Sequence, residues 1–170
     1  MAFSVHVEGI RFAAGHFATY RGQCEPLHGH SYEVAAEVEG LLTQDSWVAD
    51  FTDLKAVLRG LCDELDHRFI LQAESQVLKI DRSGTAWKVR TPAGLGYVFP
   101  VQDVAALPID NSTAERLAEY LSGRLCQSLL EAGTDNVGRV AVEVWEGPGQ
   151  RARHVREVTG NGAEGRLPLD

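Results

Sequence analysis

The sequence has few cysteines, no excess of positive charge and no long apolar segment, and each absence excludes a class of protein. Its three cysteines, Cys24, Cys62 and Cys126, are too few and odd in number for a disulfide framework, which favours a reducing compartment. A net charge of −8 argues against a broad surface for nucleic acid or anionic lipid. No run approaches the roughly 18 apolar residues of a membrane span, and no basic stretch precedes an apolar one at the start. We therefore expect a cytoplasmic protein with no nucleic-acid partner and no membrane partner.

The length of 170 residues, with 44% apolar and 24% charged residues, is typical of a single soluble globular domain. We place this domain at residues 1–160. The last residues, 161–170, are rich in glycine and poor in apolar side chains, and they are predicted to form a loose tail.

Hydrophobic patterns predict four strands and two helices. Alternating apolar residues place the strands at about 3–16, 29–39, 140–146 and 152–158. The first helix is predicted to follow an N-cap at Asp50, with an apolar stripe that runs to Leu65. The second begins at the capping-box pattern Ser112-Thr113-Ala114-Glu115 and ends at Gly133. Strands that bracket two helices indicate an α+β fold in which both helices cover one face of an antiparallel sheet.

An insertion of about residues 69–110 separates the two helices. Two short apolar runs within it flank Ser83-Gly84 and predict a hairpin, and the remainder is interrupted by proline and glycine. Because the insertion follows Asp66-His67 directly, it could cap a site there, extend an oligomer or alter substrate choice.

Two imidazoles lie close together in His28-Gly29-His30. In extended backbone they share one face, roughly 6.5 to 7 Å apart along the strand. His16 ends the preceding strand, so a hairpin-like pairing would bring a third imidazole alongside and leave a fourth zinc position open, as in catalytic zinc sites. The alternative is that these are surface histidines or hydrogen-bonded core histidines.

Glu146 continues the apolar face formed by Val140, Val142 and Val144. Burial of a carboxylate costs several kcal/mol unless the group is paired, so this position predicts a specific partner in the protein or in a ligand. In the alternative interpretation the strand ends there and the carboxylate is hydrated.

Cys24 is the cysteine placed for reactivity, because it precedes His28 by four residues in a loop, whereas the other two fall inside the predicted helices. A metal ion and an imidazolium nearby would lower its pKa and suit it to remove a proton or attack a substrate. Asp66-His67, at the end of the first helix, could orient a general acid or base. Structurally, His67 would gain only from the helix dipole while Asp66 faces water.

Six separated blocks of the sequence resemble, in order, those of the 6-pyruvoyl-tetrahydropterin synthases and the related 6-carboxy-tetrahydropterin synthases. The blocks are Phe12-Ala13-Ala14-Gly15-His16, Cys24-x-x-x-His28-Gly29-His30-Ser31-Tyr32, Asp50-Phe51-x-Asp53-Leu54, Leu65-Asp66-His67, Ser112-Thr113-Ala114-Glu115-x-Leu117-Ala118 and Val144-Trp145-Glu146. The resemblance implies a tunnelling fold, in which a four-stranded antiparallel sheet carries two helices. It also implies a homo-hexamer made from two trimers, with active sites between subunits.

The resemblance assigns a role to each candidate residue. Zn²⁺ would be held by His16, His28 and His30 and would acidify the hydroxyls of a substrate side chain. Cys24 would be the proton-transferring base, and Asp66 and His67 would complete the relay. Glu146 would anchor the pterin ring by accepting hydrogen bonds from it, with Thr113 and Glu115 bordering the pocket.

The implied substrate is 7,8-dihydroneopterin triphosphate, and we expect 6-carboxy-5,6,7,8-tetrahydropterin, triphosphate and acetaldehyde as products, on the route to queuosine and other 7-deazaguanines. The short Cys-x-x-x-His spacing favours this reaction over formation of 6-pyruvoyl-tetrahydropterin. Glu25, directly after Cys24, resembles a subgroup that also releases 6-hydroxymethyl-7,8-dihydropterin for folate; otherwise it is an ordinary loop carboxylate. A noncatalytic pterin-binding protein is the alternative of a different class.

Overall fold

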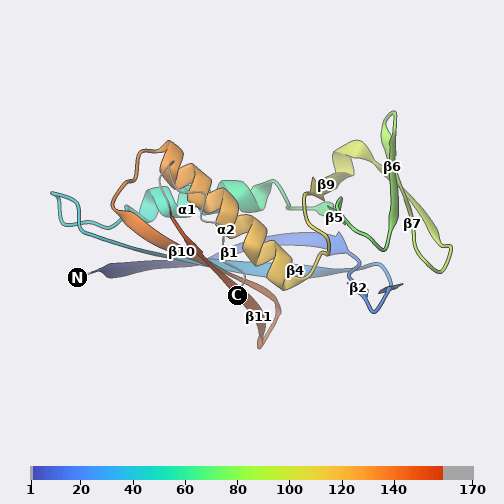
Figure 1. The fold of residues 1–170 in the computed structure, drawn as a ribbon, viewed down its shortest axis with the longest axis horizontal. Helices are drawn as coiled ribbons and strands as arrows, with labels where there is room; N and C mark the ends of the chain where they lie inside the picture. The colour runs from blue at the N-terminus through green and yellow to red at the C-terminus, as the bar shows by residue number, and fades with distance from the viewer. Residues whose placement is uncertain (1, 159–170) are drawn as a thin grey trace, which may run out of the picture.

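The computed structural model describes residues 2–158, so the predicted tail at 161–170 lies outside the described residues. Its main sheet has six strands in the order β11-β10-β4-β1-β5-β9. The strands are β1 (Phe3–His16), β4 (His28–Gly40), β5 (Arg68–Gln72), β9 (Val104–Leu107), β10 (Val137–Gly147) and β11 (Gln150–Glu157). The two helices, α1 (Phe51–Asp63) and α2 (Ala114–Glu131), lie over the same face of the long strands (Figure 1). The α+β class predicted from the sequence is therefore confirmed.

The sheet is mixed, whereas four antiparallel strands were predicted. Those four strands are present, but β5 pairs in parallel with β1, and β9 pairs in parallel with β5. Both additional strands come from the insertion and are only five and four residues long. Four of the five side chains of β5 are buried, so the segment lacks the alternation that reveals a strand with one exposed face.

The hairpin predicted around Ser83-Gly84 is part of a three-stranded antiparallel sheet. It consists of β6 (Lys79–Ser83), β7 (Ala86–Arg90) and β8 (Gly96–Pro100). A short 3₁₀ helix, Val101–Asp103, leads from it into β9. The small sheet lies at the end of the main sheet where β1 ends and β4 begins (Figure 1).

The apolar residues form two clusters. In the larger one, leucines of both helices pack on valines of the sheet: Leu54, Leu58, Leu117, Leu121, Leu125, Val34, Val38, Val140 and Val142. The smaller one joins the small sheet to the end of the main sheet through Phe17, Phe69, Leu71, Leu78, Val89 and Val104. Within residues 2–158, no helix is long and apolar enough to cross a membrane.

The helix ends differ slightly from the predictions. Asp50 caps α1 as expected, since its side chain accepts hydrogen bonds from the backbone N–H groups of Thr52 and Asp53. The helix stops at Asp63, and Leu65 is buried in the turn that follows. The N-cap of α2 is Thr113, not Ser112, so the predicted capping box is wrong by one residue. The Ser112 hydroxyl instead bonds inward, donating to the Phe17 carbonyl at 3.1 Å.

Candidate metal centre and its surroundings

The pairing of β1 with β4 brings three imidazoles together, as the sequence predicted. His16 lies opposite His28, and His30 lies opposite Ala14, at the end of the paired strands. One ring nitrogen from each histidine lies within 4.8 Å of the others, and the ring centroids are 4.6 to 5.1 Å apart. Three imidazole nitrogens that converge in this way are a suitable ligand set for one divalent ion such as Zn²⁺.

Hydrogen bonds fix which nitrogen the rings of His16 and His28 present. Nδ1 of His16 lies 2.9 Å from the Ser112 carbonyl oxygen, and Nδ1 of His28 lies 2.8 Å from the Pro26 carbonyl oxygen. Because a carbonyl can only accept, both Nδ1 atoms carry the proton and both Nε2 atoms keep a free lone pair. The His16 Nε2 atom is buried without a hydrogen-bond partner among the described residues. A metal ion among the three rings would supply that partner.

The electrostatic environment keeps His16 neutral. Its side chain is 2% exposed, and burial lowers its pKa to about 4, against the opposing effect of its hydrogen bond to the Ser112 backbone. The two neighbouring histidines lower the pKa further. At neutral pH the ring therefore carries no charge and keeps only its Nδ1 proton, which is the form that binds a metal.

Replacement of Ser112 by alanine is expected to weaken metal binding about 10-fold, as substitutions behind a metal-binding histidine commonly do. The Ser112 hydroxyl lies 3.2 Å from His16 Nδ1 and also holds the Phe17 carbonyl, so its loss loosens the ring that it supports. Zinc affinity would be measured by competition with a chromophoric chelator. The control is Ser122→Ala, which removes a buried hydroxyl that lies on α2, away from the imidazoles. Equal zinc affinities in the two variants would contradict the prediction.

The Tyr32 ring packs against the imidazoles of His16 and His30. It stacks on Phe12 at 4.7 Å and meets His16 and His30 edge-on at 6.1 and 5.5 Å. The side chain is fully buried, and its hydroxyl has no partner within the described residues. Burial and the nearby Glu146 raise the pKa of Tyr32 well above its usual range, so the hydroxyl remains protonated. No role was predicted for this residue from the sequence.

Glu146 lies beside Tyr32. Val144 pairs with Val34 and Trp145 with Glu33, so the next step along β10 places Glu146 next to Tyr32. The carboxylate is half-buried, and burial raises its pKa. The histidines His30 and His28 act against this rise, whereas the carboxylates of Glu115 and Glu25 add to it. Glu146 therefore faces the imidazoles from the same side of the sheet, as the strand parity predicted.

Cys24 lies in a small hairpin formed by β2 (Thr19–Tyr20) and β3 (Gln23–Cys24). The thiol is half-buried against the smaller apolar cluster and donates to the Glu25 carbonyl at 3.3 Å. Burial, and secondly the charge of Glu25, raise the pKa of Cys24. Burial and the charge of Glu25 thus act in the direction opposite to the lowering that was predicted from the sequence for a metal ion and an imidazolium nearby.

Asp66 and His67 form a hydrogen-bonded pair in the turn after α1. The Asp66 carboxylate accepts from the Ala13 backbone N–H at 2.7 Å and from His67 Nδ1 at 2.8 Å. These two bonds, in that order of importance, lower the pKa of Asp66. His67 is exposed, and it lines an open cleft of about 720 Å³ together with His28 and His30. The pair therefore lies beside the imidazole cluster, held to the edge of β1.

The remaining two predicted site residues lie at the start of α2. The Thr113 hydroxyl caps the helix by accepting from the Arg116 backbone N–H. Glu115 is exposed in the first turn, where its charge acts on Glu146. Glu115 is thus on the side of the cluster where Glu146 lies.

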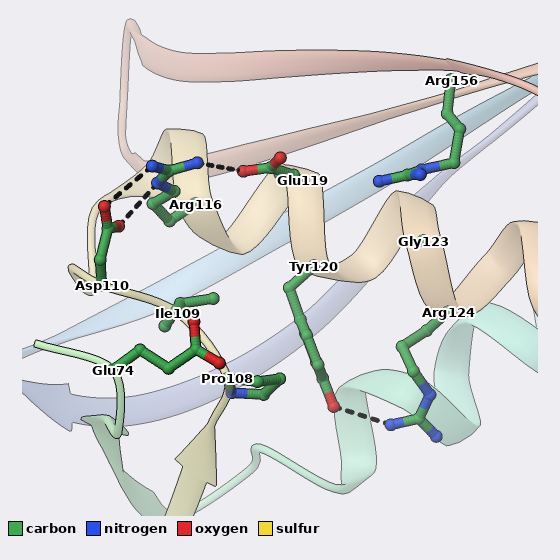
Figure 2. Close-up of a pocket in the computed structure, with 10 residues that line it drawn as sticks. All are labelled: Glu74, Pro108, Ile109, Asp110, Arg116, Glu119, Tyr120, Gly123, Arg124 and Arg156. Atoms are coloured by element: carbon green, nitrogen blue, oxygen red, sulfur yellow. Dashed lines mark hydrogen bonds and ion pairs between the residues drawn. The ribbon is translucent and has the colours of Figure 1, made fainter. Parts of the chain in front are cut away.

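A second hollow, of about 450 Å³, flanks α2 and carries several arginines (Figure 2). These arginines are largely engaged by carboxylates. Arg116 contacts both oxygens of Asp110 and also Glu119, and Arg124 bonds to Glu64. This hollow thus holds a network of ion pairs that fastens Asp110 to the helix.

The family model described as 6-pyruvoyl tetrahydropterin synthase matches residues 4–157. The chain belongs to the 6-pyruvoyl tetrahydropterin synthase family. A Methanocaldococcus jannaschii protein provisionally named 6-carboxy-5,6,7,8-tetrahydropterin synthase is 35% identical over 147 residues, or 85% of this chain and 88% of that protein. The 6-carboxy-5,6,7,8-tetrahydropterin synthase of Aquifex aeolicus is 31% identical over 137 residues, or 79% and 77% of the two chains.

A solved structure of the same family has a closely similar fold. The 6-pyruvoyltetrahydropterin synthase of Plasmodium vivax gives a TM-score of 0.86 at 33% identity, with coverage of 92% of this chain and 99% of that chain. Two further structures of the Plasmodium vivax protein carry substitutions of a glutamate described as a catalytic residue. The similarity to these proteins supports the family assignment that the six sequence blocks suggested.

Proposed function

We propose that this protein is a zinc-dependent 6-carboxy-tetrahydropterin synthase. It converts 7,8-dihydroneopterin triphosphate and one water molecule to 6-carboxy-5,6,7,8-tetrahydropterin, with release of triphosphate and acetaldehyde. The observation that carries the proposal is the imidazole trio, in which the buried Nε2 of His16 lacks a partner among the described residues. Relatives named 6-carboxy-5,6,7,8-tetrahydropterin synthase support the choice of reaction.

The residues around the trio supply binding and proton transfer. His16, His28 and His30 would hold Zn²⁺, which as a Lewis acid makes the substrate side chain easier to deprotonate. The half-buried Glu146 carboxylate accepts paired hydrogen bonds from the amino and N3 hydrogens of the pterin ring, in a pocket bordered by Thr113 and Glu115. Cys24 removes the proton, and the Asp66–His67 pair moves it onward.

Assembly into a hexamer of two trimers is part of the proposal. Within residues 2–158, β11 and β9 are the outer strands of the main sheet, and each has one neighbour. Open strand edges offer unpaired backbone groups to the strands of another copy. His67 is exposed beside the cleft, where it could serve a site completed by a neighbouring subunit. Sedimentation of the purified protein at several concentrations would test this assembly.

A second activity, formation of 6-hydroxymethyl-7,8-dihydropterin, is favoured by Glu25. This carboxylate adjoins Cys24, and its charge acts on both Cys24 and Glu146, so it lies near the proposed pterin anchor. A glutamate is the catalytic residue named for the Plasmodium vivax relative. Glu25 would serve as the base for cleavage of the side chain in this reaction.

The product distribution tests the proposed function. Purified, zinc-loaded protein would be incubated with enzymatically prepared dihydroneopterin triphosphate, and the pterins and acetaldehyde identified by mass spectrometry. We expect 6-carboxy-tetrahydropterin as the main product, in a molar ratio to acetaldehyde of about one. A predominance of 6-hydroxymethyl-dihydropterin would favour the second activity. Binding of the pterin without conversion would instead indicate a noncatalytic pterin-binding protein.

A further inference from the structure

Asn111, between β9 and α2, binds the hairpin that carries Cys24. Its Oδ1 accepts from the Thr19 backbone N–H at 2.8 Å, and its Nδ2 donates to the Thr19 carbonyl oxygen, also at 2.8 Å. One side-chain amide therefore satisfies both backbone groups of Thr19, as a neighbouring strand would. These two residues are separated by 92 positions in the sequence.

The bonds of Asn111 reach the proposed bases through the backbone. Thr19 is the residue of β2 that pairs with Cys24, and the Glu25 backbone N–H donates to the Ala18 carbonyl at 2.9 Å. At the opposite end of the hairpin, the turn consists of Arg21 and Gly22, which adopt φ values of 50° and 74°. The end of this hairpin that leads to the main sheet is thus the end to which Asn111 is bonded.

The neighbours of Asn111 bind to the other parts of the site. Ser112 supports the His16 ring through its carbonyl and hydroxyl oxygens. Asp110 is held to the first turn of α2 by its two bonds to Arg116 (Figure 2). The three consecutive residues 110–112 therefore join helix α2, the hairpin and the imidazole cluster.

We propose that Asn111 is a positioning residue, which holds the hairpin with Cys24 and Glu25 at a set distance from the imidazole cluster; this rests on the proposed function of those residues. An amide is needed because Thr19 presents one donor and one acceptor. Aspartate at this position keeps the acceptor but faces the Thr19 carbonyl with a second oxygen. Bonds from the Ser112 backbone N–H at 3.0 Å and the Gln72 amide at 3.4 Å orient the side chain.

The test compares Asn111→Asp with Asn136→Asp. Asn136 is a matched control, because it is also half-buried and its Nδ2 donates to two backbone carbonyls, those of Leu41 and Val48, at 2.7 and 2.9 Å. We expect Asn111→Asp to lower kcat about 100-fold while KM changes little, since a displacement of roughly 1 Å can have this effect on a reaction. Zinc content is expected to stay at the wild-type value. Asn136→Asp is expected to leave kcat unchanged, although its melting temperature should fall by about as much as that of Asn111→Asp.

Two readouts that need no turnover separate this inference from the proposed function. Hydrogen exchange of the Thr19 amide is expected to accelerate in Asn111→Asp but not in Asn136→Asp. Alkylation of Cys24 by iodoacetamide is expected to accelerate likewise, against buried Cys62 and Cys126 as internal references. Unchanged exchange and alkylation in Asn111→Asp, or a fall in kcat that follows zinc loss, would overturn the inference. Absence of turnover in the wild type would contradict the proposed function and leave these two readouts as the test of Asn111.

Discussion

Replacement of Cys24 by alanine is expected to lower formation of 6-carboxy-tetrahydropterin about 1,000-fold, within the range found when a general base is removed. The thiol is half-buried against the smaller apolar cluster, and its loss removes the proposed proton acceptor without changing a metal ligand. Product would be measured by mass spectrometry, and zinc by elemental analysis. Zinc content is expected to match that of the wild type.

The control for this substitution is Cys126→Ala on α2, which is buried in the larger core cluster. Cys126→Ala is expected to lower the stability of the protein and to leave its activity unchanged. A Cys24→Ala protein that still forms 6-carboxy-tetrahydropterin at the wild-type rate would contradict the assigned role of Cys24.

The Glu25→Gln variant separates the two activities, since it should lose formation of 6-hydroxymethyl-dihydropterin only. It should also lower the pKa of Cys24, because the Glu25 charge raises that pKa.

Replacement of Glu146 by glutamine is expected to raise KM for the pterin substrate about 100-fold, because hydrogen bonds to a charged acceptor contribute about 1.5–3 kcal/mol each. The amide keeps one acceptor but directs an N–H group at a ring hydrogen. Steady-state kinetics over a range of substrate concentrations would measure the effect. An unchanged KM would contradict the role of Glu146 as the pterin anchor.

Although Glu146→Gln should weaken substrate binding, it should not destabilise the folded protein. Burial raises the pKa of Glu146 in the folded chain above its unfolded value, so ionisation of this group opposes folding. The cost is fully present above the folded pKa and disappears below the unfolded one. At pH 7 the glutamine variant is therefore expected to melt no lower than the wild type, and its advantage should vanish in acid. Glu143→Gln is the control, because Glu143 forms ion pairs with Arg151 and Arg153.

The imidazole cluster shows how far local sequence can lead. Alternation along residues 3–16 and 29–39 determined which side chains share a face, so pairing of these strands placed His16 opposite His28. The parity of Val140, Val142 and Val144 likewise placed Glu146 on the inner face. These predictions succeeded because strand periodicity is a property of a few neighbouring residues.

The supports of the cluster could not be predicted in this way. Ser112 was interpreted as a helix cap, yet its hydroxyl and carbonyl hold His16, which is 96 positions away. Asn111 carried no local signal for its bonds to Thr19. The short strands β5 and β9 were missed for two reasons. Nearly all of their side chains are buried, and strands of five and four residues are too short to show a clear alternation.

The sequence by itself determined the order of the four long strands and the two helices, their inward faces and the residue types that could bind a metal, because each depends on local periodicity and side-chain chemistry. Only the tertiary structure decided the protonation of these groups. Burial makes His16 neutral and raises the pKa values of Cys24 and Glu146. Desolvation depends on every element packed around a group, and those elements come from distant parts of the chain.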